Sequence, residues 1–112
     1  MLMAALILGT LSASAQDAKN GSDLFMKYTC YGCHGFSGQN GPGMRLVPMR
    51  MTQEDFVRRV RNPANARQMP PYSAKVITDA QLGDVWAYIK TLPDSPAAKD
   101  IPLLQQILTE KK

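Results

Sequence analysis

Residues 30–34 read Cys30-Tyr31-Gly32-Cys33-His34, and this short stretch decides how the rest of the chain must fold. Two thiols three positions apart, followed directly by an imidazole, form the attachment pattern of a c-type haem. The thiols can add to the two haem vinyl groups as thioethers, and the imidazole is then placed to ligate the iron. His34 is the only histidine in the chain. The motif therefore predicts one haem c held by Cys30, Cys33 and His34, and it favours electron transfer.

Other interpretations of the same five residues are weaker. A structural zinc site needs four Cys or His ligands, and two cysteines with one histidine leave it a ligand short. A thioredoxin-like dithiol is expected in a βαβ context, whereas no alternating strand pattern flanks this motif. A short-range disulfide or a chance match is the plain alternative. The complete motif favours haem attachment over each of these.

The first fifteen residues have the character of an export signal. The run from Leu2 to Leu11 is mostly apolar but too short to span a bilayer, and residues 13–15, Ala-Ser-Ala, match a signal-peptidase site. No Lys or Arg precedes the run, so the usual basic start is missing, and an uncleaved anchor is the alternative. We expect cleavage after Ala15, a periplasmic location and no stable membrane span, because haem attachment of this kind takes place outside the cytoplasm.

Composition divides the chain into a signal peptide (1–15), a domain (16–93) and a C-terminal extension (94–112). A domain of this size has a modest core, which a buried haem would complete. The extension carries an apolar stripe at helical spacing, formed by Ile101, Leu104, Ile107 and Leu108. This pattern predicts a short amphipathic helix packed on the domain or on a partner. A frayed tail is the alternative.

Helix signals dominate the domain, and no segment alternates with the period of a strand. Apolar residues at helical spacing predict a helix that runs into the haem motif: Gly21, Phe25 and Tyr28. Residues 35–48 are rich in glycine and proline and predict a loop wrapped around a ligand. Thr52 and Asp55 resemble a capping box and begin a second helix, which Pro63 ends.

The last helix of the domain has the clearest signals. Thr78 and Gln81 form a capping-box pair, and Pro93 stops the helix just after Leu92. The side chains at helical spacing between these limits predict one buried face: Leu82, Val85, Trp86 and Ile89. We interpret the large aromatic residues of this helix, Trp86 and Tyr88, as core packing rather than as electron relays.

The order of these elements resembles a class I cytochrome c over residues 20–93. The resemblance implies an all-α fold in which three to five short helices wrap around one covalently attached haem. In that family a Gly and a Phe of the first helix cross an aromatic residue of the last helix, and Gly21, Phe25 and Tyr88 match those positions. One departure is visible. Nine positions separate Gly21 from Cys30 where eight is more familiar, which affects the helix register and not the haem motif.

The family's second axial ligand is a methionine between the motif and the last helix. Met69 precedes Pro70-Pro71 and resembles the family's Met-Pro ligand segment, so the resemblance implies iron held by His34 and Met69. Met26 lies too near the attachment site for this role. The fallback ligands lie in or just after the glycine loop: Met44, Met49 and Met51. A thioether ligand raises the reduction potential and leaves no open iron site, so we expect an electron carrier and not an enzyme.

The resemblance also implies three further residues around the haem. The carbonyl of Pro42 is expected to accept a hydrogen bond from the ring nitrogen of His34 that faces away from the iron, which fixes the orientation of the imidazole. Leu46 and Tyr72 are expected to line the haem pocket.

Charge gives information about partners. The net charge is +4, and all six arginines lie within residues 45–67: Arg45, Arg50, Arg58, Arg59, Arg61 and Arg67. We expect some of them to pair with haem propionates and the rest to form a basic face that attracts an acidic redox partner. An ordinary solvated helix surface is the alternative for Arg58, Arg59 and Arg61. Export and covalent haem argue against nucleic-acid binding.

Three classes of function follow from the sequence. The first is a diffusible mono-haem carrier of single electrons between redox partners. The second is an electron-accepting subunit of a periplasmic dehydrogenase, which would give the C-terminal stripe a purpose. The third is a ligand-binding haem protein, which requires that Met69 does not bind the iron.

Overall fold

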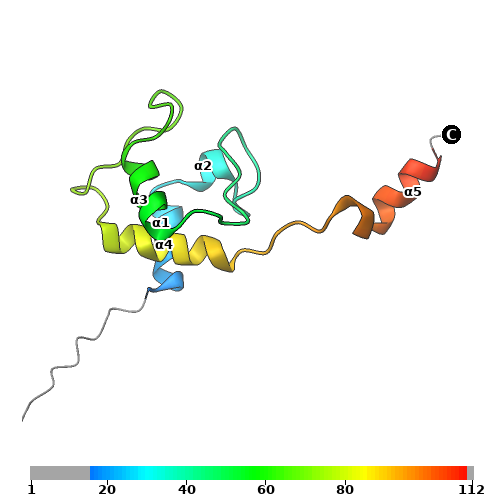
Figure 1. Ribbon diagram of the computed structural model, residues 1–112, viewed down its shortest axis with the longest axis horizontal. Helices are drawn as coiled ribbons and strands as arrows, with labels where there is room; N and C mark the ends of the chain where they lie inside the picture. The colour runs from blue at the N-terminus through cyan, green and yellow to red at the C-terminus, as the bar shows by residue number, and fades with distance from the viewer. Residues whose placement is uncertain (1–15, 111–112) are drawn as a thin grey trace, which may run out of the picture.

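The structure is a computed structural model that describes residues 16–110, so the predicted signal peptide lies outside the described residues. The described part of the chain contains helices and no strand (Figure 1): α1 (Ala18–Lys27), α2 (Tyr31–His34), α3 (Gln53–Arg61), α4 (Asp79–Thr91), the 3-10 turn η1 (Ala98–Asp100) and α5 (Pro102–Glu110). The predicted all-α fold class is therefore confirmed. No helix within residues 16–110 combines the length and the hydropathy that crossing a membrane would require.

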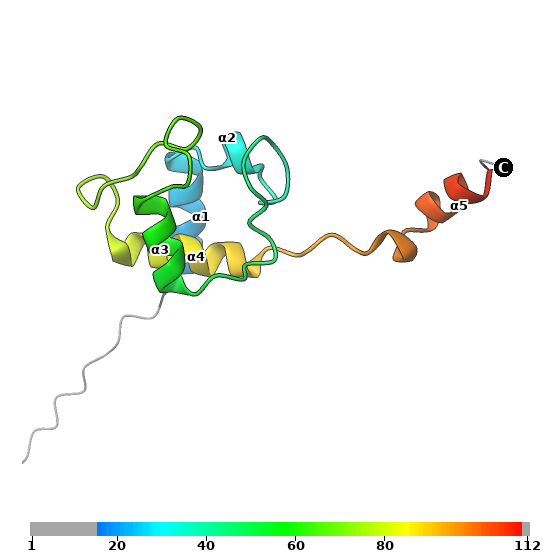
Figure 2. The ribbon, with the colours of Figure 1, turned by 45° about the horizontal axis from the view of Figure 1, so that its top comes forward.

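Helices α1 and α4 cross at the centre of the domain (Figure 2). A Cβ atom at Gly21 would overlap the backbone carbonyl of Asp84 and would lie 2.9 Å from the Cβ of Tyr88. Only glycine therefore allows the two backbones to approach so closely. Four residues further on, the ring of Phe25 meets the ring of Tyr88 edge-on, with centroids 5.5 Å apart. The crossing that the sequence predicted is confirmed.

Helices α3 and α4 begin at the capping residues that the sequence indicates. The hydroxyl of Thr52 accepts a hydrogen bond from the backbone N–H of Asp55, although Asp55 does not complete the reciprocal half of a box. At Thr78 both halves form, because the Gln81 side chain also accepts from the backbone N–H of Thr78. The chain between α3 and α4, residues 62–78, is called the Met69 segment below.

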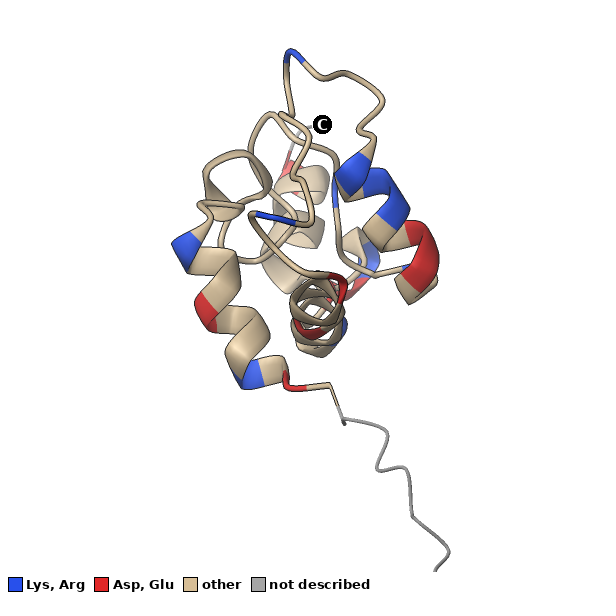
Figure 3. Ribbon diagram, turned by 90° about the vertical axis from the view of Figure 1, so that its left-hand side faces the viewer, with Lys and Arg blue, Asp and Glu red and all other residues tan. Residues whose placement is uncertain are grey.

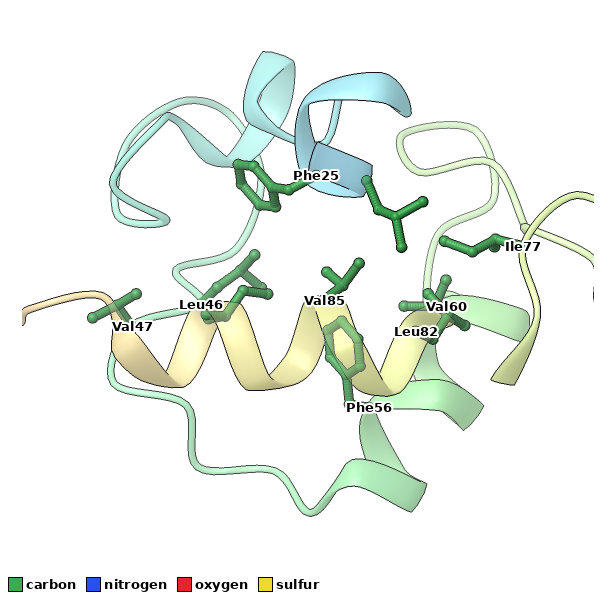
Figure 4. Close-up of a cluster of buried hydrophobic side chains, with 10 residues drawn as sticks. Phe25, Leu46, Val47, Phe56, Val60, Ile77, Leu82 and Val85 are labelled. Carbon is green, nitrogen blue, oxygen red and sulfur yellow. The ribbon is translucent and has the colours of Figure 1, made fainter. Parts of the chain in front are cut away.

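The core lies between α1, α3, α4 and the loop before α3 (Figure 4). Its buried side chains come from each of these elements and from the Met69 segment: Leu24, Phe25, Leu46, Val47, Phe56, Val60, Ile77, Leu82, Val85 and Ile89. Trp86 and Tyr88 are half-buried and pack against this cluster, as predicted. The indole N–H of Trp86 donates to the backbone carbonyl of Met51 at 3.0 Å, which ties the loop to α4.

Helix α5 stands away from the domain at the end of an extended stretch of chain (Figures 1 and 2). It contacts η1, and none of its residues is buried. Its aliphatic side chains face solvent: Leu103, Leu104, Ile107 and Leu108. The C-terminal extension is therefore helical, as predicted, but the structure does not place this helix on the domain.

Candidate functional site

The C-terminal turn of α1 determines the direction in which the chain enters the Cys-Tyr-Gly-Cys-His motif. The N–H of Cys30 donates to the carbonyl of Phe25, and the N–H of Thr29 donates to the carbonyl of Met26, each at 3.1 Å. These two bonds form a Schellman motif, which requires a left-handed residue just beyond the helix. Thr29 fills that position with φ of 56°. The chain thus reverses within two residues, and α2 begins directly afterwards.

Both thiols of the motif are free in the structure. Cys30 precedes the first turn of α2 and is half-buried, and this burial raises the pKa of its thiol above the ordinary value. Cys33 lies on α2 and is exposed. The described residues bring no three His, Cys, Asp or Glu side chains together around a possible metal ion, so a zinc ligand set is not assembled there.

The glycine-rich loop folds back over α2. The N–H of Gly43 donates to the carbonyl of Cys33 at 2.7 Å. A Cβ atom at Gly41 would lie 2.6 Å from the same carbonyl, and one at Gly43 would lie 2.8 Å from the imidazole of His34. Gly41 also has φ of 92°, a conformation that side chains rarely adopt. These two glycines therefore allow the loop to lie directly against the motif.

His34 is buried, and its Nδ1 lies 2.7 Å from the backbone carbonyl of Met44. The expected partner was the carbonyl of Pro42, so the residue predicted for this contact is wrong. The physical reason is the path of the loop. Because the backbone crosses the edge of the imidazole at Gly43, the carbonyl that points at Nδ1 belongs to the next residue and not to the preceding one.

The other ring nitrogen of His34, Nε2, has no hydrogen-bond partner among residues 16–110. The same part of the chain holds no fully buried side-chain nitrogen or oxygen without a partner. Nε2 therefore borders accessible space while Nδ1 is anchored to the backbone. A histidine that ligates a metal needs one ring nitrogen held by a hydrogen bond and the other free. The held nitrogen fixes the orientation of the ring.

Two tyrosines join the Met69 segment to the end of α1, just before the motif. The hydroxyl of Tyr28 donates to the carbonyl of Val76 at 2.9 Å, and the hydroxyl of Tyr72 approaches the carbonyl of Tyr28 at 3.4 Å. The two rings meet edge-on with centroids 6.4 Å apart. Burial raises the pKa of the Tyr72 hydroxyl, and the negative charge of the Cys30 and Cys33 thiolates would raise that pKa further. Tyr72 thus contacts Tyr28, two residues before the motif.

The methionines differ in how the structure places them. Met26 and Met44 have exposed side chains. The backbone carbonyl of Met44 lies at Nδ1 of His34, the ring nitrogen that would not bind the iron. The remaining candidates of the sequence, Met49, Met51 and Met69, are half-buried and pack against the core. Of these three, only Met69 belongs to the segment that contacts Tyr28, two residues before the motif.

Leu46, predicted to line the pocket, is buried in the core, and its N–H donates to the carbonyl of Gly38 at 2.7 Å.

The six arginines separate into two sets. Three form ion pairs with nearby carboxylates: Arg45 with Asp94, Arg58 with Asp55, and Arg61 with Asp79. The other three have no ion pair within the described residues: Arg50, Arg59 and Arg67. Two of these, Arg50 and Arg59, line an open groove between residues 44–51 and 94–97.

Sequence reasoning missed several residues that shape the site. The carbonyl of Met44 carries no sequence signal, because every residue has a backbone carbonyl. Tyr28 was placed on the helix face by its spacing, but nothing in the sequence indicated its bond to Val76. Arg61 appeared only as one of a cluster of basic residues, whereas its guanidinium reaches two separate points of the fold. Each of these contacts depends on how distant segments meet.

The residues present fit a haem c. Two free thiols lie at the start of α2 and within it, an anchored imidazole follows them with Nε2 accessible, and two glycines admit the loop that anchors it. The fold and the site together define a class I c-type cytochrome. Residues 16–89 match the family described as "Cytochrome C oxidase, cbb3-type, subunit III", which covers most of the chain, so the protein belongs to this family. No curated protein and no solved structure matches the chain.

Membership of this family determines the general function. Its members carry electrons with haem and are in general not enzymes. The protein is therefore a haem-containing electron-transfer cytochrome, and such a protein acts between redox partners.

Proposed function

We propose that the protein is an exported, periplasmic mono-haem cytochrome c that carries single electrons through a haem ligated by His34 and Met69. The observation that carries this proposal is the placement of His34, with Nδ1 held by the Met44 carbonyl and Nε2 accessible. Sequence features support the export of the chain, because a short apolar run and an Ala-Ser-Ala site precede Gln16.

In this proposal, Cys30 and Cys33 attach the cofactor by addition of each S–H bond across one vinyl group. The bound haem supplies a one-electron ferric–ferrous couple. His34 ligates through Nε2, and the hydrogen bond from Nδ1–H to Met44 increases the basicity of the imidazole. Met69 would supply the second protein ligand, a thioether that favours the ferrous state, and an iron held by His34 and Met69 would leave no site for a substrate.

Charge supports a partner with an acidic docking face. Arg50, Arg59 and Arg67 have no carboxylate partner in the described part of the chain, so their charge is available to a neighbouring molecule. Figure 3 shows how the basic residues of α3 gather at one end of that helix while its acidic residues occupy the first turn. Phe36 and Met44 expose apolar surface next to the motif. A basic surface with an apolar contact suits a short-lived electron-transfer complex whose association rate falls with salt.

The experiment that tests the ligation is absorption spectroscopy of the ferric haem-loaded protein and of its Met69→Ala variant. We expect the red charge-transfer band of methionine-ligated ferric haem in the wild type and its loss in the variant. Met26→Ala is the matched control, because Met26 is exposed on α1 and its loss leaves the band unchanged. Met49→Ala and Met51→Ala test the two other half-buried thioethers.

Two outcomes contradict His34 and Met69 ligation. A band that survives Met69→Ala but disappears in Met49→Ala or Met51→Ala moves the ligand to the loop before α3. A wild-type ferric spectrum that is high-spin and lacks the band means an open iron site. The protein then belongs among ligand-binding haem proteins.

Helix α5 favours a second candidate function, an electron-transfer subunit held in a larger redox assembly such as a periplasmic dehydrogenase. Its four aliphatic side chains face solvent and its nine residues have no tertiary support in the domain. A helix this short is marginal in water by itself, so a partner surface would stabilise it. Residues 94–97 and η1 would then act as the tether between the partner and the haem domain.

The two candidates are separated by the size of the native haem-staining species. A free carrier elutes at the size of a single chain, with or without residues 102–112. An assembly subunit elutes with a larger complex, and removal of residues 102–112 releases the haem domain from it. A large species that survives this truncation contradicts the role of α5.

A further inference from the structure

Arg61 is the most buried of the three ion-paired arginines, with 17% of its side chain exposed, against 66% for Arg58 on the same helix. Its guanidinium makes two separate contacts. Nη1 donates to the backbone carbonyl of Tyr72 at 3.0 Å, and Nη2 donates to the carboxylate of Asp79 at 2.6 Å. Two donors of one rigid guanidinium therefore hold two points of the chain.

These two points belong to the segment that carries the proposed ligand. Arg61 is the last residue of α3, so the Met69 segment begins immediately after it. Tyr72 lies within the segment, three residues beyond Met69. Asp79 is the first residue of α4, directly after the segment ends. One side chain thus connects the beginning, the interior and the end of the same loop.

The other contacts that hold the segment on the domain do not involve a charged side chain, unlike those of Arg61. Within the segment, Asn65 forms a local turn that accepts from the N–H of Met69 at 2.9 Å, but this bond does not tie the loop to the domain. The ties to the domain are the burial of Ile77 in the core, the long bond from Tyr72 N–H to the Val60 carbonyl, 3.3 Å, and the tyrosine contacts with Tyr28. Among the described residues, Arg61 supplies the only hydrogen bonds between the rest of the domain and this segment that involve a charged group, and such bonds are about twice as strong as neutral ones.

The loss of these contacts would open the segment. The carbonyl of Tyr72 would lose its charged donor, and the carboxylate of Asp79 would lose its cation. Loss of either contact therefore favours an open segment. A segment that opens would move Met69 together with Tyr72.

We propose that Arg61 is the positioning residue that keeps the Met69 segment closed and thereby sets how readily the methionine ligand is displaced. The inference rests on the proposed ligation by Met69. Arg61 acts through the loop, because its hydrogen bonds within residues 16–110 go to Tyr72 and Asp79 and not to the motif or to Met69. An added iron ligand such as imidazole can replace Met69 only when the segment opens. The contacts of Arg61 oppose this opening and therefore weaken the binding of the added ligand.

The test titrates the ferric haem-loaded protein with imidazole and follows the loss of the methionine charge-transfer band. We expect Arg61→Gln to bind imidazole about ten times more tightly than the wild type, because less free energy is needed to open the segment. Arg58→Gln is the matched control, since it removes an arginine–aspartate pair from the same helix but touches no residue of the segment. Its imidazole affinity stays at the wild-type value.

Two further measurements make the result specific. Asp79→Asn removes one of the two contacts of Arg61 at a residue that is 77% exposed, so the variant folds even if Arg61→Gln does not. We expect about a threefold gain in imidazole affinity from it, smaller than the tenfold effect because the bond to Tyr72 remains. Hydrogen exchange of peptides from residues 62–78 in the ferric protein without imidazole reports the opening directly, and Arg61→Gln accelerates it about tenfold.

Failure of the inference differs from failure of the proposed function. A wild type without the charge-transfer band overturns the Met69 ligation. A wild type with the band, in which Arg61→Gln and Asp79→Asn match Arg58→Gln in imidazole affinity and in exchange, overturns the role of Arg61 alone. Equal acceleration of exchange in all peptides of the domain also overturns it, because the effect is then global destabilisation.

Discussion

Single residues determine how closely the elements of this small domain approach one another. Gly21 is required because the backbone of α4 occupies the space where a side chain would lie. Gly41 and Gly43 are required for the same reason at the motif, where the loop lies on the carbonyl of Cys33 and on His34. Thr29 is the reverse case, because a β-branched residue holds a left-handed backbone conformation that is unfavourable for it. The site is therefore shaped by backbone contacts as much as by side chains.

Substitution of Gly21 by Ala tests the crossing of α1 and α4. The added Cβ would overlap the backbone of Asp84, which cannot move as a flexible side chain would. We expect the free energy of unfolding of the haem-loaded protein to fall by about 3 kcal/mol, at the upper end of overpacking effects. Denaturant unfolding followed by circular dichroism measures the change.

Gly32→Ala is the matched control for Gly21→Ala. It adds the same methyl group at a helical glycine that has no atom within 4 Å of the new Cβ. Its stability stays at or slightly above the wild-type value, because alanine is the better helix former by about 1 kcal/mol. Equal unfolding midpoints for the two variants would show that the helices do not cross as described.

At the scale of elements, the helices begin where local sequence signals indicate, and the loops between them carry the chemistry. Helices α3 and α4 have side-chain caps at Thr52 and Thr78. The glycine loop and the Met69 segment have no regular structure, but hydrogen bonds tie the glycine loop to the motif and the Met69 segment to Tyr28 at the end of α1. Short capped helices thus act as fixed points between which the two loops are held.

The complete capping box of α4 gives a prediction at this scale. Thr78→Ala removes the hydroxyl that accepts from the N–H of Gln81. We expect a loss of about 1 kcal/mol in the free energy of unfolding, the usual effect of losing an N-cap. Thr78→Ser keeps the hydroxyl and serves as the control with nearly wild-type stability. Thermal unfolding compares the variants, and equal losses in both would mean that the methyl group of Thr78 matters rather than the cap.

At the scale of the whole molecule, the protein has a haem domain and a separate C-terminal helix. The core is shared by α1, α3 and α4, whereas α5 buries none of its residues. Positive charge is also distributed unevenly, since the arginines without ion pairs in the described region come from the loop before α3, from α3 and from the Met69 segment. Stability and partner binding therefore depend on different parts of the chain.

Removal of residues 102–112 tests this separation. Because α5 contacts η1 and not the core, we expect the free energy of unfolding of the domain to change by less than about 0.5 kcal/mol, as for surface changes in general. The absorption spectrum stays the same in both oxidation states. Thermal unfolding of the full-length and truncated haem-loaded proteins measures the difference, and a clear loss of stability would show that α5 packs on the domain in solution.

Much of the architecture was predictable because the signals are local. The capping residues Thr52 and Thr78 and the stop at Pro93 define helices from their immediate neighbours. Gly21, Phe25 and Tyr88 were predicted to meet through the family resemblance, and the structure confirms it. The role of Met69 as a ligand stays a prediction, although Tyr72 of the same segment contacts Tyr28, two residues before the motif.

The contacts that were not predictable join backbone groups or long side chains across distant segments. The carbonyl that holds His34 belongs to Met44 and not to Pro42, because the loop turns against the imidazole at Gly43. The partner of Arg61 is a backbone carbonyl eleven positions away. Neither contact leaves a pattern in the sequence, since any residue can supply a carbonyl.

The sequence by itself determined the haem motif, the all-α class and the limits of α3 and α4, because thiol spacing, helical periodicity and capping act over a few residues. Only the tertiary structure decided which carbonyl anchors His34, that Tyr72 contacts Tyr28, that Arg61 contacts both Tyr72 and Asp79, and that α5 stands apart from the domain. These features depend on the path of loops between fixed helices, and that path follows from packing and hydrogen bonding of the whole chain.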